Sequence, residues 1–316
     1  SGYAGLGGVC LNWGCIPTKT LLRSAEIFDL IKRSSDYGIN ILDHNIDLVK
    51  IIERSKNVAS KLSNGVKFLL SKNKVTLIKG SANFIDQNSL LVKKPDSEKT
   101  ENLLSKNIII ATGAKPKEIP ELPIDGNVIW NYRNALRPKK VPAKLVIIGS
   151  GAIGIEFASF YNSIGTEVFV LEMEDRILPV EDLEISEYAK KQFEKKGIKF
   201  YLKSEFEVTK KTDNQISLCI STNNQKININ SPHILVAIGV KGCIDDLGLD
   251  IIGVDSKSNK IITNEYCETN IKGIFAIGDV ASIPCLAHKA SHQGIMVAEL
   301  ISGKKILGSW GGGINL

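Results

Sequence analysis

The stretch Leu145-Val-Ile-Ile-Gly149-Ser-Gly151-Ala-Ile-Gly154-Ile-Glu156 places a GxGxxG pattern directly after an apolar run and at the start of a helical pattern. In a dinucleotide-binding unit, the first glycine permits a tight turn, the second lets the backbone approach a pyrophosphate, and the third lets the helix pack on the strand. A glycine turn can also serve helix packing alone, but the flanking strand and helix favour binding. The residues expected to contact a dinucleotide are Gly149, Ser150, Gly151, Ala152, Ile153, Gly154, Ile155 and Glu156.

An acidic residue closes the next strand pattern, Glu167-Val-Phe-Val-Leu-Glu172. It follows the glycine turn at the spacing, about 20 residues, that places a carboxylate next to the adenosine ribose. Glu172 can accept hydrogen bonds from the ribose 2′-hydroxyl and would repel a 2′-phosphate. The sequence therefore predicts NAD rather than NADP.

Outward from this turn, strand-like runs alternate with helical patterns, which indicates an α/β architecture. A proline-rich passage around residue 120 indicates a domain boundary. The expected elements before the turn are two helices over 16–66, a β-meander over 74–94 and a buried strand over 107–112. Those expected after it are strands over 144–149, 167–171 and 199–202, a helix over 183–196, further strands to 237, one strand over 274–277 and a helix over 288–301.

The composition excludes several classes of protein. The 316 residues are 43% hydrophobic and 23% charged, which is typical of a water-soluble globular protein of two or three domains. No run of about 20 apolar residues is present to span a membrane. The net charge of +6 comes from scattered basic residues, which does not indicate nucleic-acid binding. Of six cysteines only two are close together, which fits neither a secreted disulfide framework nor a zinc site, so we expect a reducing compartment and no metal.

The close pair is Cys10 and Cys15. In a regular helix, Cα atoms five residues apart are about 8 to 9 Å apart, beyond the usual disulfide limit of about 7 Å. A bridge therefore requires an irregular turn, which Gly14 permits. At a helix N-terminus such a bridge would be redox-active, and Lys19 would add to this effect if it turned toward the sulfurs. Spacing alone leaves two buried structural cysteines as the alternative.

The segment Gly7-Gly-Val-Cys10-Leu-Asn-Trp-Gly-Cys15-Ile-Pro-Thr-Lys19 resembles the redox-active segment of the pyridine nucleotide-disulfide oxidoreductases, and most closely that of the members that oxidise dihydrolipoyl groups. Residues 110–114, the turn with Glu156, residues 236–239 and residues 269–279 match further family motifs in the same order. The resemblance implies an α/β fold of two Rossmann-like three-layer domains, with the NAD domain inserted into the FAD domain. Residues 1–120 and 243–316 would bind FAD, and residues 121–242 would bind NAD.

The resemblance also implies roles for individual residues. Cys10 and Cys15 would form a disulfide that alternates with a dithiol; Cys10 would exchange with the substrate, and Cys15 would lie nearer the flavin. Lys19 would lie beside the flavin ring, paired with Glu156. The implied FAD contacts are Gly80, Thr112, Gly113, Ala114, Asp279, Cys285, Leu286, Ala287 and His288. The implied NAD contacts are the glycine turn, Glu172, Gly239 and Phe206.

Several of these residues have a structural alternative. Gly80 and Gly113 could be turn glycines, and Asp279 could cap a helix. For His288 a structural role is favoured. Three further cysteines are expected to be ordinary small residues; they are Cys219, Cys243 and Cys267.

The sequence departs from the family pattern at both ends. The family begins with a GxGxxG unit and ends with an interface domain that carries a His and Glu acid-base pair. Neither has a counterpart in this sequence, and the tail 308–316 resembles neither of them. None of the four histidines lies in a sequence context that matches the family's acid-base histidine; they are His44, His233, His288 and His292. At residues 240–242 this chain has Val-Lys-Gly, where many relatives carry a pair of arginines. We therefore expect a truncated product, or a protein with further segments, and no turnover by these residues alone.

The implied activity is that of a flavoprotein which oxidises dihydrolipoyl groups and passes electrons through the disulfide and FAD to NAD⁺. Its partner would be the lipoyl domain of a 2-oxo-acid dehydrogenase acyltransferase. It would be a homodimer when full length, located in the cytoplasm or, in a eukaryote, in the mitochondrial matrix; the cytoplasm is preferred. The alternatives are a glutathione- or mercuric-type disulfide reductase and a non-catalytic nucleotide-binding fragment.

Overall fold

The computed structural model describes residues 5–95, 97, 99–222 and 225–304. The tail 308–316 and residues 1–4 therefore lie outside the described residues. The chain divides into two compact units, each built from two segments. Unit 1 comprises the residues up to Leu69 together with Pro116–Gly239, and unit 2 comprises Leu70–Lys115 together with the residues from Val240 onward.

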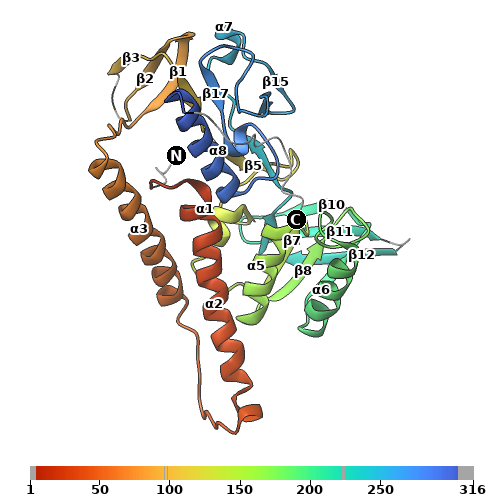
Figure 1. Ribbon diagram of the computed structural model, residues 1–316. Coiled ribbons are helices and arrows are strands. Elements are labelled where there is room, and N and C mark those ends of the chain that lie inside the picture. Colours follow the sequence, from red (N-terminus) through yellow and green to blue (C-terminus); the bar gives the residue numbers. More distant parts are fainter. Residues whose placement is uncertain (1–4, 96, 98, 223–224, 305–316) are drawn as a thin grey trace. The chain divides into compact units, whose positions relative to one another are not determined.

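Unit 1 is built on a parallel sheet of five strands in the order β6-β13-β7-β8-β9, of which Figure 1 labels β7 and β8. The central strand β7 has alternating side chains that enter two different cores: Leu145 and Ile147 face one, and Val146 and Ile148 face the other. A parallel strand buried on both faces reads as a continuous apolar run, which explains the pattern before the glycine turn. The strands are β6 (Ile129–Trp130), β7 (Lys144–Ile148), β8 (Glu167–Leu171), β9 (Lys199–Tyr201) and β13 (His233–Val236).

Three layers enclose these two cores. On one face, α5 (Ala152–Ser163) and α6 (Leu183–Lys195) pack on the sheet, with Phe157 and Phe160 of α5 fully buried. On the other face lies an antiparallel sheet of β10 (Glu205–Lys211), β11 (Ile216–Thr222) and β12 (Gln225–Ser231). This arrangement is the Rossmann-like three-layer domain that the sequence predicts.

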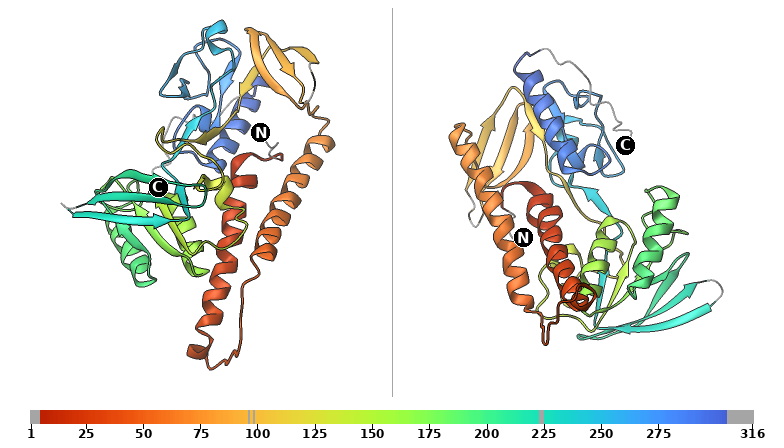
Figure 2. Two further views of the ribbon diagram at one scale, coloured as in Figure 1. Left: turned by 180° about the vertical axis from the view of Figure 1, so that it is seen from behind. Right: turned by 60° about the horizontal axis from the view of Figure 1, so that its bottom comes forward.

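The N-terminal helices belong to the same unit. They are α1 (Gly8–Trp13), α2 (Cys15–Lys32) and α3 (Leu48–Lys72), with the 3₁₀ turn η1 (Ser34–Tyr37) between the last two. Leu21 and Ala25 of α2 are buried in the core that contains α5, and Figure 2 shows α2 running beside α5. Ser55 of α3 donates a hydrogen bond of 3.1 Å to the Pro17 carbonyl of α2. The two helices predicted over 16–66 are confirmed, although residues up to Leu69 group with the nucleotide turn and not with the last segment of the chain.

Unit 2 contains a parallel pair, β4 (Ile108–Ile110) with β17 (Ile274–Ala276), and an antiparallel meander. The meander consists of β1 (Ser81–Asp86), β2 (Ser89–Lys93) and β3 (Thr100–Leu104). The prediction that it begins at residue 74 is wrong: residues 75–79 form no strand, and Val75 and Leu77 are exposed. The third strand comes instead from Thr100–Leu104.

The last segment holds more structure than the single strand and helix expected. Besides β17 it contains the hairpin of β15 (Ser256–Lys257) and β16 (Lys260–Ile261). Directly before this segment, β14 (Val240–Gly242) pairs with β5 (Ala114–Pro116). The helices are α7 (Leu249–Ile252), η2 (Gly278–Val280) and α8 (Ala287–Ile301). Strands of two or three residues are too short to show a periodicity in the sequence.

No helix in the part of the chain that the structure describes is long and apolar enough to cross a membrane.

Candidate active site

Cys10 and Cys15 form a disulfide, with their Cα atoms 4.7 Å apart. This separation is shorter than a continuous helix allows, because Gly14, with φ −135° and ψ −115°, separates α1 from α2. Cys15 is the first residue of α2, an 18-residue helix, so its sulfur lies where the helix dipole favours a thiolate. The irregular turn that the sequence analysis requires for a bridge is therefore present at Gly14.

An ion pair joins the helix that follows the disulfide to the helix of the glycine turn. Lys19 Nζ of α2 lies 3.1 Å from Glu156 Oε1 of α5, and the Glu156 side chain is 31% exposed. The resemblance implies this pairing, and it explains why Glu156, the one charged residue of α5, stands in that helix. Lys19 donates to Glu156 from a side chain that is itself 67% exposed.

The glycines of the turn differ in what a side chain would meet. A Cβ added at Gly154 would collide with the Gly149 carbonyl oxygen, and one at Gly149, where φ is +100°, would lie 2.6 Å from the Ala237 carbonyl. A Cβ at Gly151 would meet no atom within 4 Å. Gly149 and Gly154 are thus required by packing, whereas Gly151 borders open space at the N-terminus of α5, as expected for a position approached by a pyrophosphate.

Glu172 is fixed by hydrogen bonds from the turn. Its Oε2 accepts from the Ser150 backbone N at 2.8 Å and from Ser150 Oγ at 2.7 Å, and its Oε1 accepts from the Glu174 N at 3.0 Å. A carboxylate has about four acceptor positions, so one position on Oε1 is left for a further donor. This geometry fits a ribose hydroxyl. The GxGxxG motif predicts Ser150 as a cofactor contact, but it does not predict that the Ser150 side chain positions Glu172.

Two other predicted NAD contacts lie in unit 1. Gly239, with φ +98°, is exposed and follows β13, and a Cβ there would meet no atom within 4 Å. Phe206 of β10 packs against the core between the two sheets. Gly239 lies at the carboxyl edge of the sheet, where ligands of such folds bind, while the position of Phe206 fits a structural role equally well.

Unit 2 brings together several of the predicted FAD contacts. Thr112 Oγ1 donates to the Cys243 carbonyl at 2.7 Å, and Gly113, with φ +72°, borders open space. Asp279 lies in η2 after β17, and burial raises the pKa of its carboxyl group against the opposing charges of Lys289 and Lys260. Among the described residues no side chain or backbone group donates a hydrogen bond to this half-buried carboxylate. Such an acceptor fits the hydroxyl groups of a flavin side chain.

The segment Cys285 to His288 lies at the start of α8. Cys285, Ala287 and His288 are exposed and Leu286 is the N-cap residue. Although the residue as a whole is exposed, partial shielding of its thiol from water and the charge of Asp279 raise the pKa of Cys285, against the charge of Lys260, whose Nζ lies 3.9 Å from Sγ. No sequence motif points to Lys289, which is only 6% exposed and donates to Ser282 Oγ at 2.8 Å.

The remaining predicted FAD contacts are Ala114 and Gly80. Ala114 is buried in β5. A Cβ at the exposed Gly80 would lie 2.7 Å from the Lys93 carbonyl, which supports a packing reason for this glycine.

The other four cysteines form no disulfide; they are Cys219, Cys243, Cys267 and Cys285. Within the described ranges no group of three or more His, Cys, Asp or Glu side chains could hold a metal ion.

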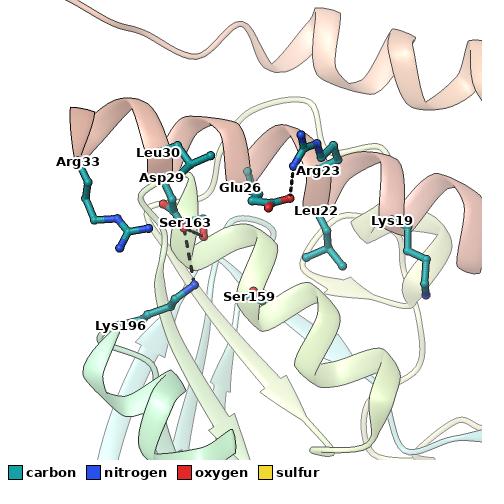
Figure 3. Close-up of a pocket in the computed structure, with 11 residues that line it drawn as sticks. Lys19, Leu22, Arg23, Glu26, Asp29, Leu30, Arg33, Ser159, Ser163 and Lys196 are labelled. Carbon is teal, nitrogen blue, oxygen red and sulfur yellow. Dashed lines mark hydrogen bonds and ion pairs between the residues drawn. The ribbon is translucent and has the colours of Figure 1, made fainter. Parts of the chain in front are cut away.

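A pocket of about 480 Å³ lies between α2 and α5, with Lys19 at one end (Figure 3). Its charged walls are largely paired with one another: Arg23 with Glu26, and Asp29 with Lys196. Neither disulfide sulfur nor any residue of the glycine turn lines it. Of the residues given a role in the chemistry, only Lys19 lines this pocket, and the disulfide and the glycine turn lie outside it.

Comparison with known proteins agrees with this geometry. Residues 3–294 match the family model described as "Pyridine nucleotide-disulphide oxidoreductase". A dihydrolipoyl dehydrogenase of Zymomonas mobilis is 45% identical over 299 residues, covering 94% of this chain and 64% of the relative. One of Bacillus subtilis is 36% identical over 303 residues, covering 95% and 64%. The chain thus spans about 64% of the length of these relatives.

Two solved structures are also similar to this chain over most of its length. The crystal structure of LpdA from Mycobacterium tuberculosis has a TM-score of 0.87 and 25% sequence identity, covering 96% of this chain and 66% of the other. The flavoprotein disulfide reductase RclA of Escherichia coli has a TM-score of 0.82 and 26% identity, covering 96% and 64%. Members of this family use FAD and NAD(H), and the redox-active disulfide is one of its features. From the motifs, the disulfide, the nucleotide turn and these matches, we conclude that the chain belongs to the pyridine nucleotide-disulphide oxidoreductase family.

Proposed function

We propose that this protein is a dihydrolipoyl dehydrogenase, which oxidises dihydrolipoyl groups with NAD⁺ through FAD and the Cys10–Cys15 disulfide. The observation that carries the proposal is the position of the disulfide. It begins a long helix, α2, which the Lys19–Glu156 pair connects to the helix of the dinucleotide turn. The names of the relatives support the choice of substrate.

Thiol–disulfide exchange explains the first half of the reaction. A thiolate of the dihydrolipoyl group attacks Cys10 Sγ, a new sulfur–sulfur bond forms, and Cys15 leaves as a thiolate. The second substrate thiol loses its proton to a base and attacks the substrate sulfur of this mixed disulfide, so that Cys10 leaves and the lipoyl disulfide is released. The substrate has then lost two electrons, and Cys10 and Cys15 have gained them.

The N-terminus of α2 stabilises the negative charge left on Cys15. FAD, when bound, would supply a two-electron acceptor for the reduced cysteine pair and a hydride donor for NAD⁺. Thr112, Gly113 and Asp279 would hold FAD, together with Gly80, Ala114 and residues 285–288. The glycine turn, Glu172 and Gly239 would hold NAD, with Phe206 nearby.

The same proposal covers organisation and partners. Residues 1–120 and 243–316 would form the FAD-binding domain and residues 121–242 the NAD-binding domain. The full-length protein would be a cytoplasmic homodimer that acts on the lipoyl domain of a 2-oxo-acid dehydrogenase acyltransferase. Glu172 supports NAD as the acceptor because its carboxylate would repel a 2′-phosphate.

The test is NADH formation from dihydrolipoamide and NAD⁺ by the full-length protein and its cysteine variants. We expect Cys10→Ser and Cys15→Ser each to lower kcat by more than about 10³-fold, as removal of a catalytic nucleophile does. Cys219→Ser is the matched control, because Cys219 is a half-buried cysteine of β11 that forms no disulfide, and it should keep full activity.

Two outcomes would contradict the proposal. Turnover by Cys10→Ser close to that of the wild type would exclude exchange at this sulfur. Reduction of glutathione disulfide or Hg²⁺ with NADPH, without oxidation of dihydrolipoamide, would favour the glutathione- or mercuric-type alternative.

A further inference from the structure

Trp13 stands between the two cysteines in the sequence and contacts a different part of unit 1. The Arg137 guanidinium carbon lies 4.0 Å from the centre of the Trp13 ring, and that of Arg133 lies 5.3 Å from it. An arginine stacked on an indole ring is attracted to its π face. Partial burial of this guanidinium also lowers the pKa of Arg137. Trp13 therefore connects the segment of the disulfide to residues more than a hundred positions away.

The arginines belong to a firmly held segment. Arg133 is in α4 (Tyr132–Ala135), whose first turn is closed by a capping box between Asn131 and Asn134. Tyr132 and Ala135 of this helix are buried in the core beneath α5. The Ala135 carbonyl also accepts a hydrogen bond of 2.6 Å from the Tyr161 hydroxyl. Trp13 thus packs against a part of the unit that is fixed by its own contacts.

The helix that carries Cys10 is held much less firmly. α1 has six residues, none of them buried, and its N-cap Gly7 makes no side-chain hydrogen bond. Asn12 donates to the carbonyls of Gly5, Leu6 and Gly8, but these groups belong to the same short segment. Val9 and Trp13 are its two side chains that pack against the core. The orientation of α1 therefore depends strongly on Trp13.

The disulfide depends on that orientation. Cys10 lies in α1 and Cys15 begins α2, and the backbone between the two helices turns at Gly14. The Cα atoms are 4.7 Å apart only while α1 keeps its angle to α2. We propose that Trp13, held by Arg137 and Arg133, is a positioning residue that keeps the two sulfurs within bonding distance and so sets the reduction potential of the pair. This inference deepens the proposed function, since it concerns the same disulfide.

The expected direction follows from the effective concentration of the two thiols. When dithiothreitol reduces the bridge, two electrons and two protons pass to Cys10 and Cys15, and the reagent closes into its own cyclic disulfide. In the reduced protein, a loosened α1 lets Cys10 move away from Cys15, so the bridge reforms less readily. We expect Trp13→Ala to shift the equilibrium about tenfold toward the dithiol, which corresponds to about +30 mV for a two-electron couple.

The experiment equilibrates the full-length protein without oxygen in mixtures of reduced and oxidised dithiothreitol. The reaction is stopped with acid, the free thiols are alkylated, and the Cys10 and Cys15 peptides are counted by mass. Trp13→Phe keeps an aromatic ring but binds a cation less strongly, so its shift should be smaller than that of Trp13→Ala. Arg23→Gln is the control, because Arg23 of α2 pairs with Glu26 and should leave the potential unchanged.

A double-mutant cycle separates positioning from the charge of Arg137. Arg137→Gln removes both the stacking contact and a positive charge, whereas Trp13→Ala removes only the contact. If the contact positions the disulfide, Arg137→Gln has little further effect in the Trp13→Ala background. An undiminished effect of Arg137→Gln in that background would overturn the proposal, because the arginine would then act through its charge.

A folded Trp13→Ala variant whose potential is within twofold, in equilibrium constant, of the wild type would also overturn it. NAD⁺ binding, which involves other residues, reports whether the variant is folded. If Trp13→Ala does not fold, Trp13→Phe decides the question: a shift no larger than that of Arg23→Gln would overturn the proposal. The thiol equilibrium needs neither dihydrolipoamide nor NAD⁺, so its result is independent of whether the proposed activity is found.

Discussion

Removal of the Ser150 hydroxyl group tests whether the glycine turn positions the ribose-binding carboxylate. Ser150 is completely buried, and its Oγ donates to Glu172 Oε2 at 2.7 Å beside the bond from its own backbone N. Ser150→Ala removes the hydroxyl and keeps the backbone donor. Glu172 then has one donor fewer on Oε2 and more rotational freedom.

The magnitude follows from the type of bond. A hydrogen bond from a hydroxyl to a charged group contributes about 1.5 to 3 kcal/mol net, so the free energy of unfolding should fall by about that amount. The affinity for NAD⁺ should fall about tenfold, or about 1.4 kcal/mol, because the free carboxylate no longer points its remaining acceptor position at the ribose. The affinity for NADP⁺ should change less, so the ratio of the affinity for NAD⁺ to that for NADP⁺ should decrease.

The assay combines urea unfolding with calorimetric titration of NAD⁺ and NADP⁺ on the full-length protein. Ser163→Ala is a matched control: Ser163 is a buried serine of α5 that donates to Asp29 Oδ2, also at 2.7 Å. It should lose comparable stability without losing NAD⁺ affinity. If Ser150→Ala loses stability as Ser163→Ala does but binds both nucleotides as the wild type does, then Ser150 does not position Glu172 for binding.

The other predictions concern the glycines, the ion pair and a half-buried histidine. Gly154→Ala should lower the free energy of unfolding by about 1 to 3 kcal/mol in urea, because its Cβ would collide with the Gly149 carbonyl. Gly151→Ala, which has open space and a φ of −67°, should leave stability within about 0.5 kcal/mol but weaken NAD⁺ binding in the same titration; unchanged binding would contradict a pyrophosphate at this position. Lys19→Gln should cost less than about 1 kcal/mol of stability, since Lys19 is 67% exposed, yet should slow flavin reduction in stopped-flow measurements. Burial lowers the pKa of His233, so the unfolded chain binds the proton more readily and stability should decrease as the pH falls below about 6.5. His233→Gln should flatten this slope in urea titrations at several pH values, and an unchanged slope would contradict the prediction.

Local patterns explain why much of the nucleotide site could be predicted. The burial of β7 on both faces produces a continuous apolar run, and the GxGxxG turn is confined to six adjacent residues that directly follow it. The helices α2 and α5 have recognisable periods because each is long enough to complete several turns. The start of the meander cannot be predicted in this way. The largely apolar run 75–78 resembles a strand in the sequence, but in the structure it pairs with no other strand.

The family, the α/β class, the disulfide segment and the acid that follows the glycine turn can all be recognised in the sequence, since each is encoded within short runs of residues. Which distant residues act on them depends on the tertiary structure. Lys19 and Glu156 are 137 residues apart, and the Trp13 ring meets Arg137 only because α1 and α4 pack in the same unit. Such contacts depend on how helices and sheet are stacked around a shared core, and that packing leaves no periodic signal at the individual positions.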